Sequence, residues 1–544
     1  MRERRRAAEC APYQPPHLVN SFPGSLRIGG SPPGWPPGAP TSSRQADGSV
    51  LLRPRSREPQ QVVLELPGQF DLNCRQLKYL PAIIALGVLT GCARFQPQPL
   101  CPADSAASLE SRSLGNPALK FFLERNLGRD LAPWPASKWD FEMLTLAAFY
   151  YQPSLDIARA VWAEASAGIE TAGARPNPTI GFSPQYAFNS AGEPPWVTAL
   201  NLDWPIETAG KRGARIAQAR RVSESARLSI SATAWQVRTQ LRASVIDFVS
   251  ATRRELLLRT QATVQEQMMA LLEQRREAGA VATAEFIPTR LLLQRARLDL
   301  SDAQRQQVEA RTRVAEAIGV PVSALKDVEV AYDLTALPAN LDQLTSSGVR
   351  RQALQHRADV LAALADYAAS EAALQIEITK QYPDLHLNTG YEYDQGLHKW
   401  GLLGFGVELP LLNRNQGLIA QAAARRREAA ARFEAVQARV IADLDRALAV
   451  YEAAARNRAG VEALLATQRA QRESVGQQRK AGAADRLDVL TAELDLAAGE
   501  LALADSQTKL HQALGALEDA VQRPLAHWPD LEQGRNIPPK EEKP

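Results

Sequence analysis

The sequence contains the same succession of strands and helices twice, and this duplication limits the folds open to it. Two stretches, 179–204 and 385–409, each alternate apolar and polar residues, which predicts a pair of β-strands joined by a polar turn. Pro178 and Pro383 precede them, 383 − 178 = 205 residues apart, and the prolines that end them have the same spacing. Long repeats indicate repeated structural units. We therefore predict two units, each built as helix, strand hairpin, long helix, turn and returning helix.

Each predicted hairpin has one apolar and one polar face. In the second hairpin the apolar residues are Leu385, Leu387, Thr389, Tyr391, Tyr393, Leu403, Phe405, Val407 and Leu409, and the other face carries residues such as His386, Asn388, Gly404 and Glu408. Strand edges this apolar are prone to pair with other chains unless they are closed or covered. A soluble core would cover them. A membrane β-barrel, apolar outside and polar inside, would also do so.

The segments around the hairpins predict very long helices. Residues 214–277 contain neither Pro nor Gly, which permits one helix of about 65 residues, or about 100 Å at 1.5 Å per residue. A second long helix is predicted from about 418 to 479. Turns near 278–284 and 481–485 lead into the returning helices. Helices of this length exceed those of ordinary globular domains and suit a coiled-coil wall.

Charge and cysteine content exclude some classes of function. The net charge is +3, but the positive excess lies in residues 1–91, so the body has no basic surface for nucleic acid. The four cysteines, Cys10, Cys74, Cys92 and Cys101, all precede residue 102, which leaves the body without a disulfide framework or a thiolate metal site. The six histidines are scattered without metal-ligand spacing.

The start of the chain indicates export. Residues 1–74 are rich in Pro, Gly, Ser and Arg and are interpreted as a disordered extension or a mis-assigned start. Residues 75–91 have a positive start followed by an apolar stretch too short to span a bilayer. They end before Cys92 in Leu-Thr-Gly-Cys, which resembles a bacterial lipobox. We therefore predict a covalent lipid on Cys92, with an ordinary signal peptide or a short buried helix as the alternatives.

Three motifs resemble one known family. Gly482–Leu517 (GAADRLDVLTAELDLAAGELALADSQTKLHQALGAL) is the best match, supported by Leu409–Gly417 and Gly210–Gly213. Together with the duplication, they resemble the TolC-like outer-membrane efflux factors, closest to the outer-membrane components of cobalt–zinc–cadmium-type RND systems. The resemblance covers roughly Trp139 to Val521.

The resemblance implies a mainly α protein with a membrane β-barrel. Three chains of four strands each would form a trimeric barrel of 3 × 4 = 12 strands, continued by an α-helical periplasmic tunnel. The implied function is a passive duct that exports substrates, among them divalent heavy-metal cations. The implied partners are a periplasmic membrane-fusion adaptor, an inner-membrane RND pump and outer-membrane lipid. No cofactor beyond the lipid on Cys92 and no nucleic acid are expected.

The predicted organisation follows the repeat. It comprises the extension 1–74, the signal peptide 75–91, a lipid-anchored linker 92–138, the first repeat 139–320, an equatorial connector 321–357, the second repeat 358–522 and a C-terminal tail 523–544.

The family's functional positions map onto the two turns. The resemblance places an acidic gate ring at Asp488, with Glu285 as its partner from the first repeat and Thr491 where a second aspartate would lie. Ala484 replaces the expected arginine, although Arg486 is near. The predicted adaptor-docking tips contain Gly279, Thr283, Gly482, Asp485 and Leu487. The simpler interpretation is local: Asp485 with Asp488, like Thr283 with Glu285, fits a helix cap followed by a carboxylate in the first turn.

Other classes of function fit the sequence less well. An efflux factor for drugs or for type I secretion would share the same architecture. A periplasmic coiled-coil adaptor would explain the helices but not two strand hairpins. The sequence lacks the nucleophile, phosphate-loop and metal motifs that would predict an enzyme.

Overall fold

The computed structural model describes residues 95–188, 194–336 and 347–524. The chain divides into two units, residues 1–109 and 110–544. In the described part of the first unit, helix α3 (Pro102–Glu110) begins after a short segment without regular secondary structure. The predicted extension, the signal peptide, the lipidation site Cys92 and most of the C-terminal tail lie outside the described residues.

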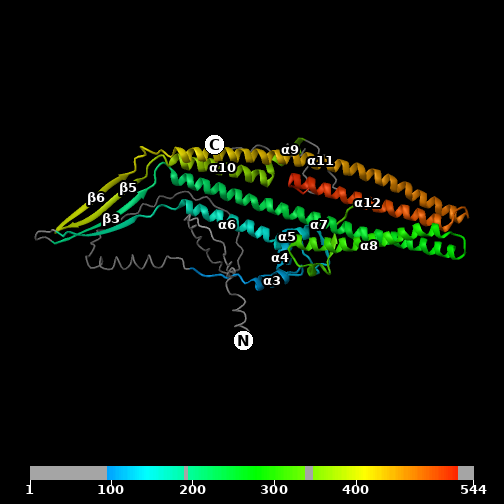
Figure 1. The fold of residues 1–544 in the computed structure, drawn as a ribbon. Coiled ribbons are helices and arrows are strands. Elements are labelled where there is room, and N and C mark those ends of the chain that lie inside the picture. The colour runs from blue at the N-terminus through cyan, green and yellow to red at the C-terminus, as the bar shows by residue number, and fades with distance from the viewer. Residues whose placement is uncertain (1–94, 189–193, 337–346, 525–544) are drawn as a thin grey trace, which may run out of the picture. The chain divides into compact units, whose positions relative to one another are not determined.

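Four long helices form the body of the second unit (Figure 1). They are α7 (Lys211–Glu277), α8 (Thr283–Ile318), α11 (Gln416–Lys480) and α12 (Arg486–Val521). α7 packs along α8, α11 packs along α12, and α12 also packs along α7, so α12 has the most buried residues of the four. The predicted long helices are confirmed, and neither Gly460 nor Gly476 interrupts α11.

Two shorter helices complete the repeat. They are α6 (Pro153–Gly173) and α10 (Ala358–Thr379). Both pack against α7, and α10 also packs against α11. α6 begins at Pro153, where proline is favoured because a first-turn residue needs no backbone N–H donor. Within the described residues, no helix is both long enough and apolar enough to cross a membrane.

The two predicted hairpins are present and join into one antiparallel sheet. The strands are β2 (Thr179–Tyr186), β3 (Trp196–Ile206), β5 (Leu385–Asp394) and β6 (Leu397–Val407). Their order is β2-β3-β5-β6, so β3 of the first repeat pairs with β5 of the second. The pairing places Phe182, Leu200 and Tyr391 side by side on one face. The predicted separation into an apolar and a polar face therefore extends across the whole sheet.

A β-bulge in β6 keeps the faces separate where simple alternation would fail. Asn388 is opposite Gly404, but Gly390 is opposite Gly401, so two residues of β6, Leu402 and Leu403, match one residue of β5. Without the extra residue, the side chains beyond it would change faces. With it, Trp400 lies opposite Tyr391 on the apolar face, with ring centroids 4.8 Å apart.

The later part of the segment predicted as a linker, from Leu114 onwards, is instead part of the folded core. Within 95–138, α4 (Pro117–Leu127) begins at an Asn116 cap, whose side chain accepts from the amide of Ala118, and it buries Leu119 and Leu123 completely. The apolar face of this short helix supplies the burial, which a linker would lack. The linker expectation is corrected for these residues.

A two-stranded parallel sheet lies next to α4. It consists of β1 (Lys138–Asp140) and β4 (Glu329–Ala331), and it is followed by α5 (Phe141–Tyr151). Trp139 lies in β1 and is fully buried. β4 lies within the segment predicted as the connector between the two repeats. The connector also contains a 3-10 turn (Val322–Leu325) and α9 (Ser347–His356), of which Val349 is fully buried.

Buried ions join α7 to α12 close to this small sheet. Glu518 of α12 is 2% exposed and forms ion pairs with Arg238, at 3.0 Å, and with Arg242. Both guanidinium groups also lie 4.9 Å from the ring centroid of Phe141. Burial lowers the pKa of Arg242 to about 10, but the group stays charged at neutral pH. One carboxylate therefore holds two desolvated cations between two helices.

Candidate functional site at the helical tips

The two long helix pairs reverse direction through the same backbone turn. After α7, the amide of Gly279 donates to the carbonyl of Arg276 (2.9 Å) and the amide of Ala280 donates to that of Arg275 (2.8 Å). After α11, Gly482 and Ala483 repeat both bonds with carbonyls of that helix. Both glycines have positive φ angles, 72° and 77°, a backbone conformation that residues with a side chain rarely adopt. The predicted tip glycines therefore have a definite structural role.

The second tip opens with a complete capping box. The carboxylate of Asp485 accepts the amides of Leu487 and Asp488, the latter at 3.0 Å. In return, the carboxylate of Asp488 accepts the amide of Asp485 at 2.8 Å. The arrangement satisfies N–H groups that have no partner within the helix. The local interpretation of these aspartates is confirmed.

Polar contacts connect the two tips. Arg275 at the end of α7 donates to the carboxylate of Asp485 at 2.9 Å, and Arg486 donates to Gln267 of α7 at 3.0 Å. The amide of Asp488, and next the guanidinium of Arg275, hold the pKa of the Asp485 carboxyl below its usual value. Because Asp485 is about half exposed, its ion pair with Arg275 is weak and sensitive to salt.

An apolar cluster lies beneath these contacts. Met268, Leu272, Phe286 and Leu490 are buried together, and Leu487 packs against them. The guanidinium of Arg276 lies 4.8 Å from the ring centroid of Phe286. Since the cluster draws on α7, α8 and α12, the two helix pairs are packed together at the tip. Separating the tips would expose this cluster to water.

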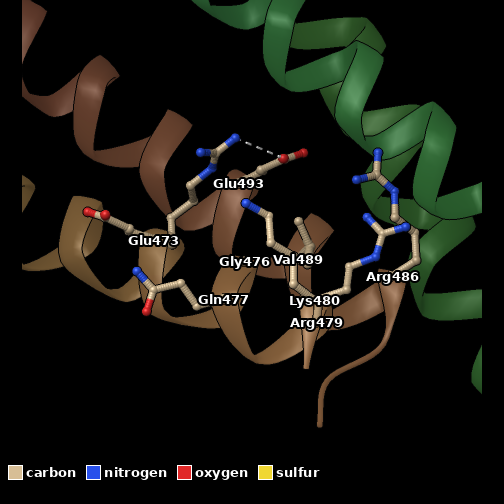
Figure 2. A pocket seen from close by; sticks show the side chains of 9 residues that line it. Glu473, Gly476, Gln477, Arg479, Lys480, Arg486, Val489 and Glu493 are labelled. Atoms are coloured by element: carbon tan, nitrogen blue, oxygen red, sulfur yellow. Dashed lines mark ion pairs between the residues drawn. The ribbon is translucent and has the colours of Figure 1, made fainter. Parts of the chain in front are cut away.

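A polar groove runs between α11 and α12 at the same end (Figure 2). Its volume is about 470 Å³. It is lined by Arg472, Glu473, Gly476, Gln477, Arg479, Lys480, Arg486, Val489 and Glu493. Arg472 and Glu493 form an ion pair across it at 3.5 Å. The groove carries more basic than acidic side chains. The sequence predicted an acidic tip from its aspartates and gave no sign of this basic groove.

The structure describes the side chains of three of the four predicted gate residues, and all three lie near the start of α12. Asp488 and Arg486 share the first turn of α12, and the hydroxyl of Thr491 donates to the carbonyl of Leu487 at 2.9 Å. Glu285 and Thr283 lie in the first turn of α8, but their side chains are outside the described part of the structure. Whether these residues form a gate stays a prediction.

Arg275 is the site residue that sequence reasoning missed. Its partner Asp485 is 210 residues away, and no local spacing connects them. Among the described residues, no three His, Cys, Asp or Glu side chains are grouped so that they could hold a metal ion.

Comparison with known proteins adds independent findings. The chain is 25% identical over 221 residues to the cobalt-zinc-cadmium resistance protein CzcC of Cupriavidus metallidurans, covering 40% of this chain and 51% of that protein. It therefore spans about half the length of this curated relative.

Two solved structures have a similar fold. The outer-membrane channel OprN has a TM-score of 0.60 at 17% identity, covering 80% of this chain and 99% of that chain. The outer membrane protein VceC of Vibrio cholerae has a TM-score of 0.58 at 20% identity, covering 71% and 96%. At these identities the likeness concerns the fold, and it confirms the predicted TolC-like fold class.

The family assignment comes from a match to both repeats. The profile of the family described as outer membrane efflux protein matches residues 149–320 and 349–521, more than half of the chain. The two matched segments contain the two strand hairpins and both tips. The chain therefore belongs to the outer membrane efflux protein family, and its place is the outer membrane.

Proposed function

We propose that this protein is the outer-membrane duct of a tripartite RND-type efflux system. The observation that carries the proposal is the four-stranded sheet, apolar on one face and open at both edges. Such a sheet cannot face lipid alone, because its edge N–H and C=O groups would have no partners there. Three copies would close it into a 12-stranded barrel, and their long helices would continue it as a periplasmic tunnel.

The duct would be passive and would act with two partners. A periplasmic membrane-fusion adaptor would bind the tips around Gly279, Thr283, Gly482, Asp485 and Leu487, and an inner-membrane RND pump would supply the energy. The tip turns support this role, since the two repeats present the same rigid backbone at the same end. The protein would perform no chemistry on its cargo.

The proposed cargo is divalent heavy-metal cations. The similarity to a cobalt-zinc-cadmium resistance protein supports it. In a host that carries the gene, deletion should lower the tolerated concentrations of Zn²⁺, Co²⁺ and Cd²⁺ and raise cell-associated metal, and a plasmid copy should restore both. Unchanged metal tolerance in the deletion strain would contradict this cargo.

Export of organic compounds is the second candidate. A segment of 123 residues is 30% identical to the pyoverdine export outer membrane protein OpmQ of Pseudomonas aeruginosa, covering 23% of this chain. The basic groove at the tip would also suit organic anions better than metal cations. The same deletion strain distinguishes the two, because organic cargo predicts sensitivity to organic toxicants with normal metal content.

The gate assignment makes a prediction about ion selectivity. If Asp488 of three chains forms a ring, like charges meet at a narrow mouth that attracts cations. Replacing Asp488 by alanine should then lower cation selectivity and weaken block by trivalent cations in planar bilayers. As a cap alone, the change would cost about 0.5–2 kcal/mol of stability and leave selectivity unchanged. Unaltered selectivity in a folded trimeric variant would remove the gate role.

The lipobox makes a prediction about the mature protein. Cys92 should be its first residue and should carry covalent lipid, because the preceding apolar stretch is too short to be a membrane span. Intact-mass spectrometry of protein purified from outer membranes would measure this. Peptides from upstream of Cys92, or an unmodified Cys92, would show that the segment is processed differently or not at all.

A further inference from the structure

A small polar cavity lies at the end of the sheet nearest the long helices. Its volume is about 250 Å³, and its lining includes Lys211, Asp384, His386 and Glu408. Lys211 is the first residue of α7, and His386 belongs to β5. His386 and Glu408 lie on the polar face of the second hairpin, which would face the lumen of the proposed barrel. The cavity would therefore open towards the path of the cargo.

Two carboxylates flank His386, one from each neighbouring strand. Its Nδ1 lies 3.1 Å from the carboxylate of Asp203 in β3. On the other side, Gly406 of β6 is directly opposite His386, and Glu408 follows two residues later on the same face. Cα atoms at such a diagonal offset are about 7–8 Å apart, within reach of a long side chain. The imidazole therefore lies between two acidic side chains.

The contact with Asp203 suits His386 to bind a metal ion. When Nδ1 carries the proton and donates it to the carboxylate of Asp203, the lone pair of Nε2 is free to accept a ligand. Metal-binding histidines in proteins usually have such a carboxylate partner, which fixes the ring orientation and raises the basicity of the binding nitrogen. His386 lines the cavity, whereas Asp203 does not. Asp203 is therefore placed to support the histidine rather than to bind the ion itself.

The charges around the cavity leave one carboxylate without a counter-ion. Lys211 forms an ion pair with Asp384 at 2.8 Å, and Lys380 forms one with Glu377 at 2.7 Å. Glu408 also lines the cavity and is exposed, but it forms no ion pair within the part of the chain that the structure describes. A cation bound in the cavity would supply the missing positive charge.

We propose that His386 and Glu408 form a weak binding site for a divalent transition-metal cation in transit, with Asp203 as a positioning residue. An imidazole ligand favours ions such as Zn²⁺ and Co²⁺ over Mg²⁺ and Ca²⁺, which prefer oxygen ligands. Stable zinc sites have three or four protein ligands. This site has two, with water completing the shell, and a duct requires such weak binding because the ion must leave again. The proposal rests on the proposed function and specifies where the cargo contacts the duct.

The sequence repeat predicts how many such sites each chain has. By the 205-residue spacing, Glu408 corresponds to Asp203, so the two carboxylates beside the imidazole are equivalent residues of the two repeats. His386 corresponds to Gly181, so the first hairpin lacks the nitrogen ligand. We therefore expect one bound ion per chain.

Titration calorimetry with Zn²⁺ alone tests the site in full-length protein purified in detergent. The wild type should bind one ion per chain in a saturable way, and Mg²⁺ should not compete. His386→Gln and Glu408→Gln should each abolish this binding, and Asp203→Asn should weaken it by about 10–100-fold. The matched control is His398→Gln, a histidine of the same hairpin that lies opposite Tyr393 on the apolar face. It should leave Zn²⁺ binding unchanged.

Channel recordings separate the site from the duct. In planar bilayers Zn²⁺ should partly block the wild-type current, and His386→Gln should raise the half-blocking concentration by at least about tenfold, while His398→Gln should not. If either His386→Gln or the exposed variant Glu408→Gln assembled as a trimer and bound Zn²⁺ like the wild type, the site would be overturned and the duct would stand. A wild-type protein that formed neither a trimer nor a channel would overturn the proposed function itself.

Discussion

Replacing Glu518 by alanine is expected to destabilise the protein by about 3–5 kcal/mol, because it leaves buried charges without their counter-ion. Arg238 and Arg242 both depend on this carboxylate, and both side chains are less than a fifth exposed. The loss should appear as a lower midpoint of thermal or denaturant unfolding. The circular dichroism signal of the helices, measured in detergent, monitors this unfolding.

A second ion pair between the same two helices provides the control. Asp505 of α12 bonds Arg254 of α7 at 3.2 Å, but its side chain is 45% exposed. Exposed pairs contribute about 0–1 kcal/mol, so Asp505→Ala should hardly move the midpoint. Equal effects of the two substitutions would mean that the burial of Glu518 does not determine its contribution.

A lysine on the apolar face of the sheet should impair insertion into the membrane. Leu200→Lys and Phe405→Lys change equivalent positions of the two repeats, and each should cost about 2–4 kcal/mol if it lies near the bilayer midplane. Leu200 lies between Phe182 and Tyr391, which places it within the apolar face rather than at its margin. The amount of trimer in outer-membrane fractions measures the effect.

Substitutions on the polar face control for strand disruption. Asn201→Lys and Gly404→Lys lie next to the test positions but on the opposite face. A side chain at Gly404 would meet Asn388 only at ordinary contact distances, 3.5 Å or more. These variants should assemble nearly normally. If lysine were tolerated equally on both faces, the sheet would not be a barrel wall.

Local sequence signals predicted most of the fold. Pro178, Pro383 and the glycines of the two tips interrupt the chain where helices and strands end, and the absence of Gly and Pro within α7 permits its length. The capping box of α12 was also readable, because Asp485 and Asp488 are three residues apart. Each of these signals depends on neighbours in the chain, which is why the sequence alone shows them.

Features that join distant segments could not be predicted in this way. β1 pairs with β4 across about 190 residues, and Arg275 meets Asp485 across 210. Glu518 looks like any acidic residue of an Ala-rich helix until α7 brings two arginines to it. The bulge in β6 was hidden as well, since Leu402 and Leu403 give two equally apolar choices for one position.

The pairing of β3 with β5 has a consequence for how the protein folds. Each hairpin joins strands close in sequence, but Leu200 and Tyr391 are 391 − 200 = 191 residues apart. Closing so long a loop costs conformational entropy before any stabilising contact has formed. Pairings between distant strands therefore form late. We expect each hairpin to form early and the join between repeats to follow once the long helices have aligned them. Until then, the two hairpins together expose four strand edges, which favours aggregation of the unfinished chain.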